Sequence, residues 1–316
     1  MTTELVTVII PSYNHEAYVG AAIEGLLNQT HERIDLVIID DGSSDGSIAA
    51  INSYAERCEQ KFARYRFIRK PNSGLGSTLN IGIESALGEY IFINASDDVA
   101  EPDAIESLLA EMIGRDDVAL VACNNHFIDG SGNRAFWSKD HKNVYNPEDA
   151  AATTFIDWLQ NGRSDFDLRG EEFGSYARLL QGNYIPNGYL QRKSALVAAG
   201  MYNPVLPLED WPMHLALARH NKFRYLDRVV FNYRWHGANT ILDDKFGSPI
   251  KRSVLKQEKH FALSNGYADA WNAAHRGFVR EVLHDMRRWL VTVNTSSRRR
   301  QLRLFGIYFI RPPGAS

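Results

Sequence analysis

The first 125 residues alternate between two hydrophobic periodicities. Continuous apolar runs are typical of strands buried on both faces of a sheet, and apolar positions three and four apart are typical of helices packed on one side. Predicted strands occupy residues 6–10, 36–39, 65–68, 90–93 and 118–123, and helical spacing marks residues 19–27, 48–55, 79–86 and 105–112. Strands that alternate with helices predict an α/β fold with a parallel sheet and right-handed crossovers.

The pattern changes after Asn124. Residues 130–185 mix aromatic, charged and glycine residues without a sustained period, so we expect loops and short helices over the mouth of the sheet. Helical spacing returns at 193–199 and 211–220, a further strand is predicted around 229–233, and the tail from Phe278 has a helical pattern. These changes divide the chain into a domain of residues 1–240, with halves 1–125 and 126–240, and a helical C-terminal region of residues 241–316.

Composition narrows the class of protein. The chain has 316 residues, of which 44% are hydrophobic, enough for one large core with an appendage. Its formal net charge of -3 argues against general binding to nucleic acid. Cys58 and Cys123 lie far apart and form no metal-binding or disulfide pattern, which favours a reducing cytoplasm.

The two ends of the chain bear on membrane contact. Met1–Leu5 lacks the features of a signal peptide, and no apolar run approaches the roughly 18 residues of a membrane span. Arginines are concentrated between residues 280 and 311 and alternate with aromatic and aliphatic residues. They are Arg280, Arg287, Arg288, Arg298, Arg299, Arg300, Arg303 and Arg311. Basic and apolar residues together predict peripheral contact with the inner face of the cytoplasmic membrane, and a solvated helix is the alternative.

Polar groups follow four of the predicted strands. They are Ser12-Tyr13-Asn14, Asp40-Asp41-Gly42-Ser43, Asn72-Ser73-Gly74 and Ser96-Asp97-Asp98. In an open α/β sheet, ligands bind at the carboxyl ends of the strands, so these groups are predicted to converge on one crevice.

Two adjacent carboxylates are the strongest candidates for metal binding. Asp97 and Asp98 repel each other unless a positive charge lies nearby, and Mg²⁺ or Mn²⁺ held with substrate phosphates would supply it. The alternative is that they cap the next helix, because Glu101-Pro102-Asp103 follows and acidic residues favour helix starts.

Taken in order, five segments resemble the motifs of family 2 glycosyltransferases. They read IIPSYN at 9–14, IDDGSSD at 39–45, NSGLG at 72–76, GEYI at 88–91 and SDD at 96–98. The resemblance covers about residues 5–125 and extends more loosely over 190–240. It implies the GT-A fold, a Rossmann-like fold that binds nucleotide-diphosphate sugars, here with a helical C-terminal extension.

The resemblance also implies roles for individual residues. Tyr13 would pack against the nucleobase, and Asp40 would accept the ring N–H of uracil or thymine. Asp97 would hold the ribose, and Asp98 would bind Mn²⁺ or Mg²⁺ bridging the diphosphate. The implied donor-binding set is Pro11, Tyr13, Asn14, Asp40, Asn72 and Asp97. One departure is Leu79, because many relatives carry arginine there, which leaves that contact with the donor in doubt.

Two later residues complete the implied active site. Glu209-Asp210 resembles the family motif whose aspartate is the general base, and capping of the following helix is the alternative for Asp210. His236 lies in Tyr233-Arg234-Trp235-His236, a segment that closes over the diphosphate in some relatives. His236 could bind the metal or a phosphate, and a structural role is the alternative.

The function implied is inverting, metal-dependent transfer of a sugar from a UDP- or dTDP-sugar to a hydroxyl group. The acceptor would be a surface glycan or a lipid-linked saccharide, and rhamnosyl transfer is one of the reactions that this allows. A nucleotidyltransferase would share the sheet and the carboxylates, but it would carry a glycine-rich, basic loop where this chain has Pro11-Ser12-Tyr13-Asn14. A non-catalytic nucleotide-sugar-binding module would not need both Asp98 and Asp210.

Overall fold

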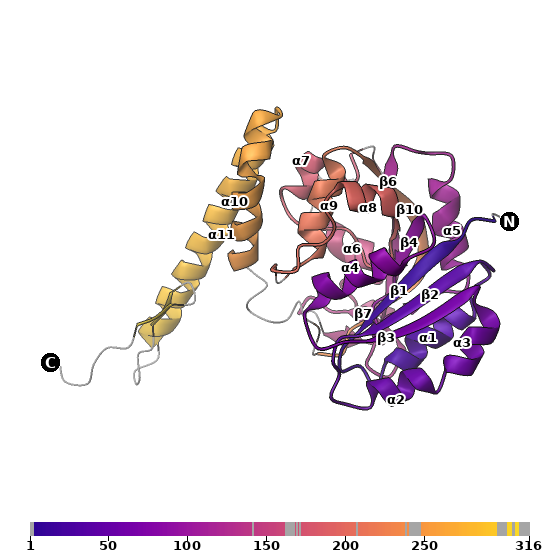
Figure 1. Ribbon diagram of the computed structural model, residues 1–316. Helices are drawn as coiled ribbons and strands as arrows, with labels where there is room; N and C mark the ends of the chain where they lie inside the picture. Colours follow the sequence, from indigo (N-terminus) through magenta and orange to yellow (C-terminus); the bar gives the residue numbers. More distant parts are fainter. Residues whose placement is uncertain are drawn as a thin grey trace. The chain divides into compact units, whose positions relative to one another are not determined.

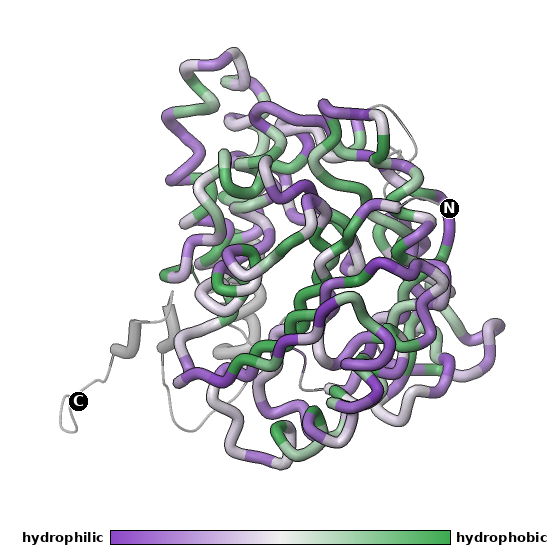
Figure 2. Tube along the Cα trace, turned by 45° about the vertical axis from the view of Figure 1, so that its right-hand side comes forward, coloured by the Kyte–Doolittle hydropathy of each residue, from purple (hydrophilic) through white to green (hydrophobic). Residues whose placement is uncertain are grey.

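Two compact units make up the chain. The computed structural model describes residues 3–140, 142–161, 168, 170, 172–206, 208–237, 239, 248–295, 302–304 and 307–309, with the backbone alone from 284 onward. The first unit contains residues 1–179 and 183–239, and the second contains residues 180–182 and 240–316. In the first unit, hydrophobic segments run through the middle and hydrophilic segments lie mostly at the periphery (Figure 2).

The first unit is built on a sheet whose first four long strands are parallel (Figure 1). These are β1 (Val6–Ser12), β2 (Ile34–Asp40), β3 (Arg64–Arg69) and β4 (Tyr90–Ile93), in the order β3-β2-β1-β4. The four strands predicted from these apolar runs are therefore confirmed, the first three with slightly longer bounds and the fourth with the predicted ones. Ser12 is in register with Asp40, so the ends of β1 and β2 coincide at one edge of the sheet.

Helices cover both faces of this sheet. Successive residues of a strand point to opposite faces, so Val8 and Ile10 of β1 join one core with α1 (Val19–Leu27) and α5 (Ala104–Met112). Ile9 faces the other side, where α4 (Leu75–Ser85) packs so closely that a Cβ on Gly82 would lie 2.7 Å from Ile9 Cγ2.

Between β2 and β3 the structure has two helices where the sequence predicted one. They are α2 (Ser47–Asn52) and α3 (Ala55–Lys61). Ser53 closes the first of them by donating its hydroxyl to Ala50 O at 2.7 Å. This contact explains the break, because serine competes with the helix for backbone hydrogen bonds.

The sheet is mixed, because two short strands that the sequence did not predict run antiparallel to their neighbours. The three-residue strand β9 (Leu190–Arg192) lies between β4 and β6 (Val118–Ile128) and runs antiparallel to both. Next to β6 lies the parallel strand β10 (Lys222–Arg234), and β5 (Val99–Ala100) pairs antiparallel with β10. β9 has three residues and β5 has two, which is too few for a strand pattern to be recognised in the sequence.

The segment expected to contain loops and short helices also contains a small antiparallel pair. β7 (Arg134–Trp137) pairs with β6 and with β8 (Asn143–Val144). Short helices follow: a 3-10 turn at Pro147–Asp149, α6 (Phe155–Gln160), α7 (Tyr176–Leu179), α8 (Lys193–Ala198) and α9 (Asp210–Ala218). The last two confirm the helices predicted near 193–199 and 211–220.

A buried carboxylate joins the first three strands. Asp35 on β2 accepts two hydrogen bonds from Arg64 of β3, one from Nε at 2.6 Å and one from Nη2 at 2.8 Å. It also accepts the hydroxyl of Thr7 on β1 at 2.8 Å and the backbone N–H of Leu87 at 3.0 Å. Asp35 is fully buried, so its charge depends on these four donors.

Asp35→Ala should lower the free energy of unfolding by about 3–5 kcal/mol, because it removes the carboxylate that pairs with Arg64 and accepts the Thr7 hydroxyl in the interior. Chemical denaturation measures this loss. Glu24→Gln is the matched control, since it breaks an ion pair with Arg57 that is largely exposed and should leave the midpoint almost unchanged. Equal losses in the two variants would show that the Asp35 network contributes no more than a surface pair.

The second unit is a pair of helices followed by two short strands. α10 (Ser248–Ser264) and α11 (Ala268–Thr295) are fastened by Trp271 Nε1, which donates to Leu255 O at 2.9 Å, and by an ion pair of Lys251 with Glu281 at 2.6 Å. β11 (Leu302–Leu304) and β12 (Ile307–Phe309) form an antiparallel pair, so the part of the tail that the structure describes contains two short strands as well as the predicted helix.

Much of the arginine-rich tail lies outside the described residues, including Arg298, Arg299, Arg300 and Arg311, and the side chains of Arg287, Arg288 and Arg303 are not described either. Peripheral membrane contact through residues 280–311 therefore stays a prediction. Among the helices that the structure describes, none is both long enough and apolar enough to cross a membrane.

Candidate active site

Loops at the carboxyl ends of β1, β2 and β4 meet at one edge of the sheet. The backbone N–H of Asn14 donates to Ser43 Oγ at 2.9 Å, and Ser44 N–H donates to Asn14 Oδ1 at 2.8 Å. His15 Nδ1 lies 2.7 Å from Ser96 Oγ, which connects the end of β1 to the end of β4. The polar groups predicted to converge therefore do so.

Asn14 shapes the first of these loops. Its φ of 52° is left-handed, a conformation that asparagine tolerates better than most residues. Its side-chain oxygen is used by Ser44, so Asn14 holds the loop after β1 to the loop after β2. The neighbouring Tyr13 has no such constraint, and 48% of its surface is exposed beside the site.

The two aspartates after β2 have different surroundings. Asp40 is buried, and its Oδ1 accepts the backbone N–H of Ser43 at 3.0 Å. Asp40 Oδ2 is also buried, and it has no hydrogen-bond partner among the described residues. A buried carboxylate oxygen without a donor is a natural position for a ligand N–H.

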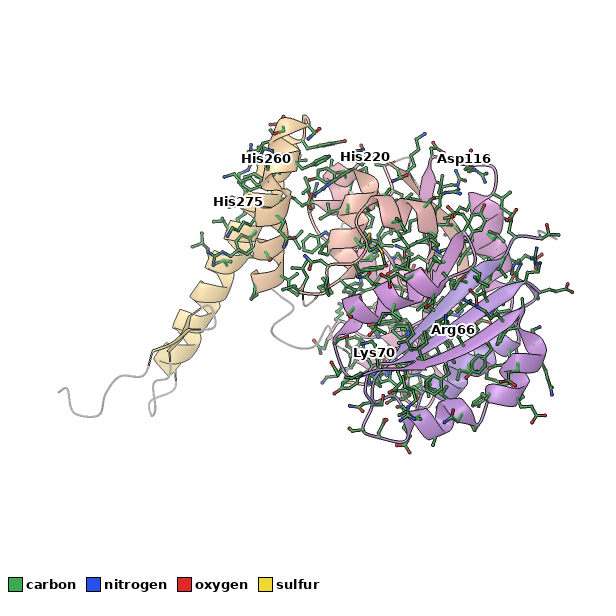
Figure 3. The ribbon with its side chains drawn as sticks, in the orientation of Figure 1. Arg66, Lys70, Asp116, His220, His260 and His275 are labelled. Carbon is green, nitrogen blue, oxygen red and sulfur yellow. The ribbon has the colours of Figure 1, made fainter. Side chains whose placement is uncertain are left out.

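Asp41 instead fixes the next loop. It pairs with Lys70, which lies just past β3 (Figure 3), and accepts the backbone N–H groups of Ser73 at 2.8 Å and Gly74 at 3.0 Å. These contacts use both oxygens of Asp41. They also set the position of Asn72, which is exposed at the same edge.

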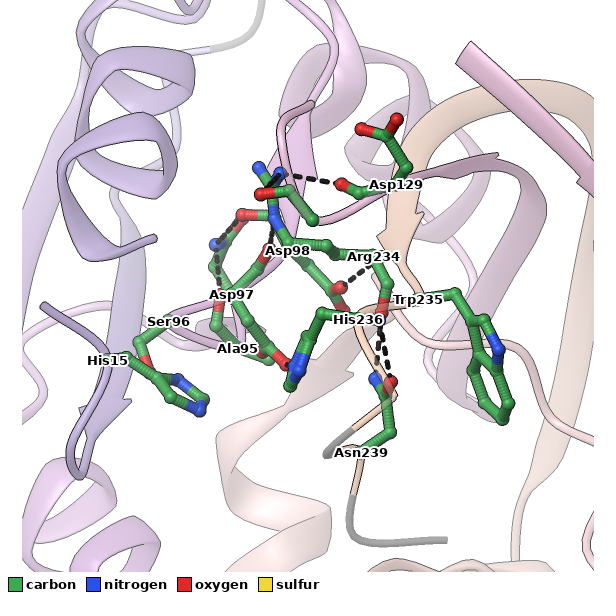
Figure 4. Close-up of polar contacts among 12 residues, drawn as sticks. His15, Ala95, Ser96, Asp97, Asp98, Asp129, Arg234, Trp235, His236 and Asn239 are labelled. Atoms are coloured by element: carbon green, nitrogen blue, oxygen red, sulfur yellow. Dashed lines mark hydrogen bonds and ion pairs between the residues drawn. The ribbon is translucent and has the colours of Figure 1, made fainter. Parts of the chain in front are cut away.

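The adjacent Asp97 and Asp98 also differ. Asp98 is buried, and its Oδ1 accepts the backbone N–H of Arg234 at the end of β10, at 2.8 Å (Figure 4). Burial raises the pKa of Asp98 well above its ordinary value, and the charge of Asp97 adds to this, while the Arg234 N–H and the Asn187 side chain oppose it. Asp98 therefore anchors the end of β10.

Arg234 fastens this part of the site further. Its Nε donates to Asp97 O at 2.6 Å and its Nη1 donates to Asp129 O at 3.0 Å. Asn239 accepts the backbone N–H of His236 at 3.0 Å and donates to Arg234 O at 2.7 Å, which closes the turn after β10. His236 is thus held by backbone contacts and not by its ring alone.

One group of side chains has metal-ligating atoms close together. His15, Asp97 and His236 each offer one such atom, and all of these lie within 4.8 Å of one another. His236 Nε2 is 3.2 Å from Asp97 Oδ2, and the His236 ring stacks on Tyr18 with centroids 4.7 Å apart. Imidazole and carboxylate are both common ligands of divalent metals, so this set fits a metal ion.

The sequence expectation had paired Asp98 with His236. The described ligand atoms that cluster with His236 are those of Asp97 and His15. In Asp98, the backbone N–H of Arg234 occupies Oδ1, and Oδ2 is buried without a hydrogen-bond partner among the described residues. His15 was not singled out in the sequence, and only its place directly after the motif at 9–14 pointed to it. Burial lowers the pKa of His15, in part offset by the charge of Asp97, which favours the neutral imidazole that binds metals.

Asp210 lies at the start of α9. Its Oδ2 accepts the side-chain N–H of Asn183 at 2.6 Å, and its Oδ1 accepts the backbone N–H of Trp211 at 2.6 Å. Burial raises the pKa of Asp210, and these two donors oppose the shift. Burial, followed by the charge of Asp210, raises the pKa of the adjacent Glu209 to about 8.

Asp210 shares an electrostatic environment with the candidate metal cluster. Tyr233 on β10 is buried, and its pKa is raised by burial and then by the charges of Asp98, Asp97 and Asp210. All three carboxylates therefore act on the same ring. The Asp210 carboxylate is separate from the cluster of His15, Asp97 and His236, and its charge acts on a ring that the charge of Asp97 also reaches.

Comparison with known proteins shows what this chain is similar to. Residues 7–162 match the family model described as Glycosyl transferase family 2. The chain is 26% identical over 264 residues to the hyaluronan synthase of Pasteurella multocida, covering 83% of this chain and 23% of that protein. It is 28% identical over 262 residues to the chondroitin synthase of Escherichia coli, covering 83% of this chain and 32% of that protein.

These alignments span about a quarter to a third of the length of the relatives.

Two solved structures share the fold. The first, Staphylococcus aureus TarS 1-349 in complex with UDP-GlcNAc, has a TM-score of 0.57 at 16% identity, covering 80% of this chain and 66% of that chain. The second, the mannosyltransferase PcManGT from Pyrobaculum calidifontis in complex with GDP-Man and Mn2+, has a TM-score of 0.54 at 14% identity, covering 92% and 84%.

Proposed function

The chain belongs to glycosyl transferase family 2 and has the GT-A fold, and from this premise we propose that it moves a sugar from a nucleotide-diphosphate sugar to a hydroxyl group of a glycan. The observation that carries the proposal is the cluster of His15, Asp97 and His236 at the strand ends, with the Asp210 carboxylate in the same electrostatic environment. The domain of residues 1–240 then has a donor half, 1–125, and an acceptor half, 126–240.

We assign the nucleobase to the open edge beside Tyr13 and Asp40. The exposed ring of Tyr13 offers a stacking surface, and Asp40 Oδ2 offers one acceptor. Because Ser43 N–H already occupies Asp40 Oδ1, a base with a single donor suits this position. Uracil and thymine present one ring N–H between two carbonyls, whereas guanine presents two neighbouring donors, so a UDP- or dTDP-sugar fits better than a GDP-sugar.

Asp40→Asn should weaken binding of UDP by about 1.5–3 kcal/mol, roughly tenfold to 150-fold in Kd. The Asn oxygen is needed by Ser43 N–H, so its amide nitrogen would face the ring N–H of uracil. CDP presents an acceptor at that ring position and should lose less. Titration calorimetry with UDP and CDP measures both, and equal losses for the two nucleotides would show that Asp40 does not contact the base.

We assign the divalent cation to Asp97 and His236, with His15 as a third ligand, in place of the earlier assignment to Asp98. Ligand atoms about 2.0–2.2 Å from one ion lie about 3–4 Å apart, so small side-chain rotations would bring the three atoms to that spacing. When bound, the metal supplies positive charge that stabilises the leaving diphosphate. PcManGT was solved with Mn2+, which supports a divalent ion without deciding between Mn²⁺ and Mg²⁺.

Asp210 is proposed as the general base. The acceptor oxygen would attack the anomeric carbon as its proton passes to the Asp210 carboxylate, and the bond from that carbon to the phosphate oxygen would break. The nucleoside diphosphate leaves with the bonding electrons. A base on the side opposite the leaving group gives inversion at the anomeric carbon.

The direct test is a donor screen with the purified protein and Mn²⁺, using UDP-, dTDP- and GDP-sugars, dTDP-rhamnose included, with saccharide and lipid-linked saccharide acceptors. Release of nucleoside diphosphate together with a lengthened glycan is the expected result. Release of pyrophosphate from a sugar phosphate and a nucleoside triphosphate would indicate a nucleotidyltransferase. Donor binding without turnover across the full acceptor panel would indicate a binding module. The hyaluronan and chondroitin synthases among the relatives support a polysaccharide acceptor.

A further inference from the structure

A chain of three polar side chains leads from Asp210, which is partly buried, through Asn183 to the buried ring of His214. Asn183 donates to Asp210 Oδ2 at 2.6 Å, and Asn183 Oδ1 lies 3.3 Å from His214 Nδ1. His214 is on α9, one turn after Asp210, and is completely buried. We propose that Asn183 and His214 are positioning residues that hold the Asp210 carboxylate in its ionised form and in a fixed orientation. This inference rests on the proposed function for the role of Asp210.

The orientation of the Asn183 amide follows from its neighbours. The backbone N–H of Ile185 can only donate, and it lies 3.4 Å from Asn183 Oδ1. Asn183 Oδ1 is therefore the acceptor end, and the amide nitrogen faces Asp210. A flipped amide would place its oxygen against the carboxylate, and two acceptors at 2.6 Å would repel each other.

The same reasoning fixes the tautomer of His214. Because Asn183 Oδ1 only accepts, His214 Nδ1 must carry the proton. His214 Nε2 is buried without a hydrogen-bond partner among the described residues, and the ring packs edge-on against Tyr189 and Phe223, with centroids 5.1 and 6.1 Å away. Burial lowers the pKa of His214 to about 3, so the ring stays neutral and keeps its Nδ1 proton through the physiological pH range.

Burial of His214 Nε2 without a hydrogen-bond donor costs free energy, and packing alone does not explain why a histidine stands at this position. A phenylalanine would fill the space between two aromatic rings without leaving Nε2 unsatisfied. What a phenylalanine lacks is the Nδ1–H donor directed at Asn183. The imidazole is therefore accounted for by the contact that it makes toward Asp210, and it serves as a neutral donor.

The groups that face Asp210 make a donor necessary. Glu209 adjoins it, and its charge above pH 8 would disfavour a second anion. The buried rings of Tyr189, Tyr202 and Tyr233 also sense the charge of Asp210 and bring no positive charge. Asn183 and the backbone N–H of Trp211 are thus the donors that oppose desolvation of the Asp210 anion.

The test compares two variants in which residue 214 does not titrate. His214→Asn keeps an amide donor near the Nδ1 position, and His214→Phe removes it. The pKa of Asp210 is raised in the folded state, so the folded state loses stability as the pH increases through that pKa and Asp210 ionises. Loss of a donor raises the pKa further and so increases this loss of stability. His214→Asn should therefore exceed His214→Phe in stability by a margin that grows as the pH rises above 3.8, the ordinary pKa of aspartate. The expected margin is about twofold to tenfold in the unfolding equilibrium constant.

Three comparisons separate this role from simple packing. In an Asp210→Asn background the pH-dependent part of the margin should vanish, because no carboxylate is left to ionise. Phe223→Leu, which removes a ring next to His214 without touching the hydrogen bonds, should lower stability equally at all pH values. Asn183→Leu should lose stability increasingly as pH rises, like His214→Phe. A margin that is constant with pH, or that persists without Asp210, would overturn the proposal.

Activity supplies an independent readout with the donor identified by the screen. The acidic limb of kcat/KM belongs to the coupled Asp210 and Glu209 pair and should move to higher pH by up to about one unit in His214→Phe. It should return toward the wild type in His214→Asn and stay in place in Phe223→Leu. The stability comparison needs no turnover, so it tests Asn183 and His214 even if the proposed transferase activity fails. An Asp210→Asn variant with full turnover would reject Asp210 as the general base and would leave the stability result unaffected.

Discussion

Asp210→Asn is expected to lower turnover by about two to four orders of magnitude and to leave donor affinity close to that of the wild type. Asparagine keeps the size of aspartate and can still accept the backbone N–H of Trp211, so the start of α9 should be preserved. It cannot take the proton of an attacking hydroxyl. Single-turnover transfer and calorimetric titration with the nucleotide measure the two quantities separately.

Glu209→Gln is the matched control for this variant. Glu209 has a pKa near 8, so it is mostly protonated at pH 7, and an amide should replace it with a small change in turnover. A large loss of donor affinity in Asp210→Asn would instead assign Asp210 to donor binding. Equal losses of turnover in both variants would assign the proton to the pair and not to Asp210.

Asp97→Ala and His236→Ala should each weaken Mn²⁺ binding by about a hundredfold or more, and chelation should abolish transfer by the wild type. Each substitution removes one of three clustered ligand atoms. Asp97 contacts Arg234 through its backbone oxygen, so the alanine variant keeps that support of the fold. Competition with a metal indicator measures affinity without any need for the sugar donor.

Asp98→Asn decides between the two neighbouring aspartates. If Asp98 serves as an acceptor for Arg234 N–H, asparagine can replace it, and Mn²⁺ affinity should stay within about tenfold of the wild type. A loss as large as that of Asp97→Ala would return the metal to Asp98. Full activity of the wild type in excess chelator would reject metal assistance altogether.

The local pattern of the chain was sufficient for the donor half of the fold. The runs at Val6–Ile10 and Leu36–Ile39 are too apolar for a half-exposed strand. The helical spacing between them predicts a helix that crosses over and makes the two strands parallel. Parallel strands place their carboxyl ends at one edge, so the convergence of the loops at residues 12–14, 40–43 and 96–98 followed from the order of the elements alone.

Short elements escaped this reasoning. β9 has only three residues, and its place between β4 and β6 depends on long-range pairing with Tyr90–Phe92 and Leu120–Val121. Strand preference over three residues is weaker than the effect of such tertiary context. The same holds for the break between α2 and α3, where one serine hydroxyl decided the end of a helix.

The sequence by itself determined which strand-end loops carry the chemistry, because hydrophobic periodicity fixes the order and direction of the long elements. Only the tertiary structure decided which side chains within those loops act together. Asp97 and Asp98 are chemically identical neighbours, and the one that turns inward is Asp98, which accepts the backbone N–H of Arg234, 136 positions away. His236 reaches Asp97 across 139 positions, and Asn183 reaches Asp210 across 27. Contacts of this kind require distant segments to be placed to within a few tenths of an ångström of each other's correct positions. No local pattern of residues encodes such a placement.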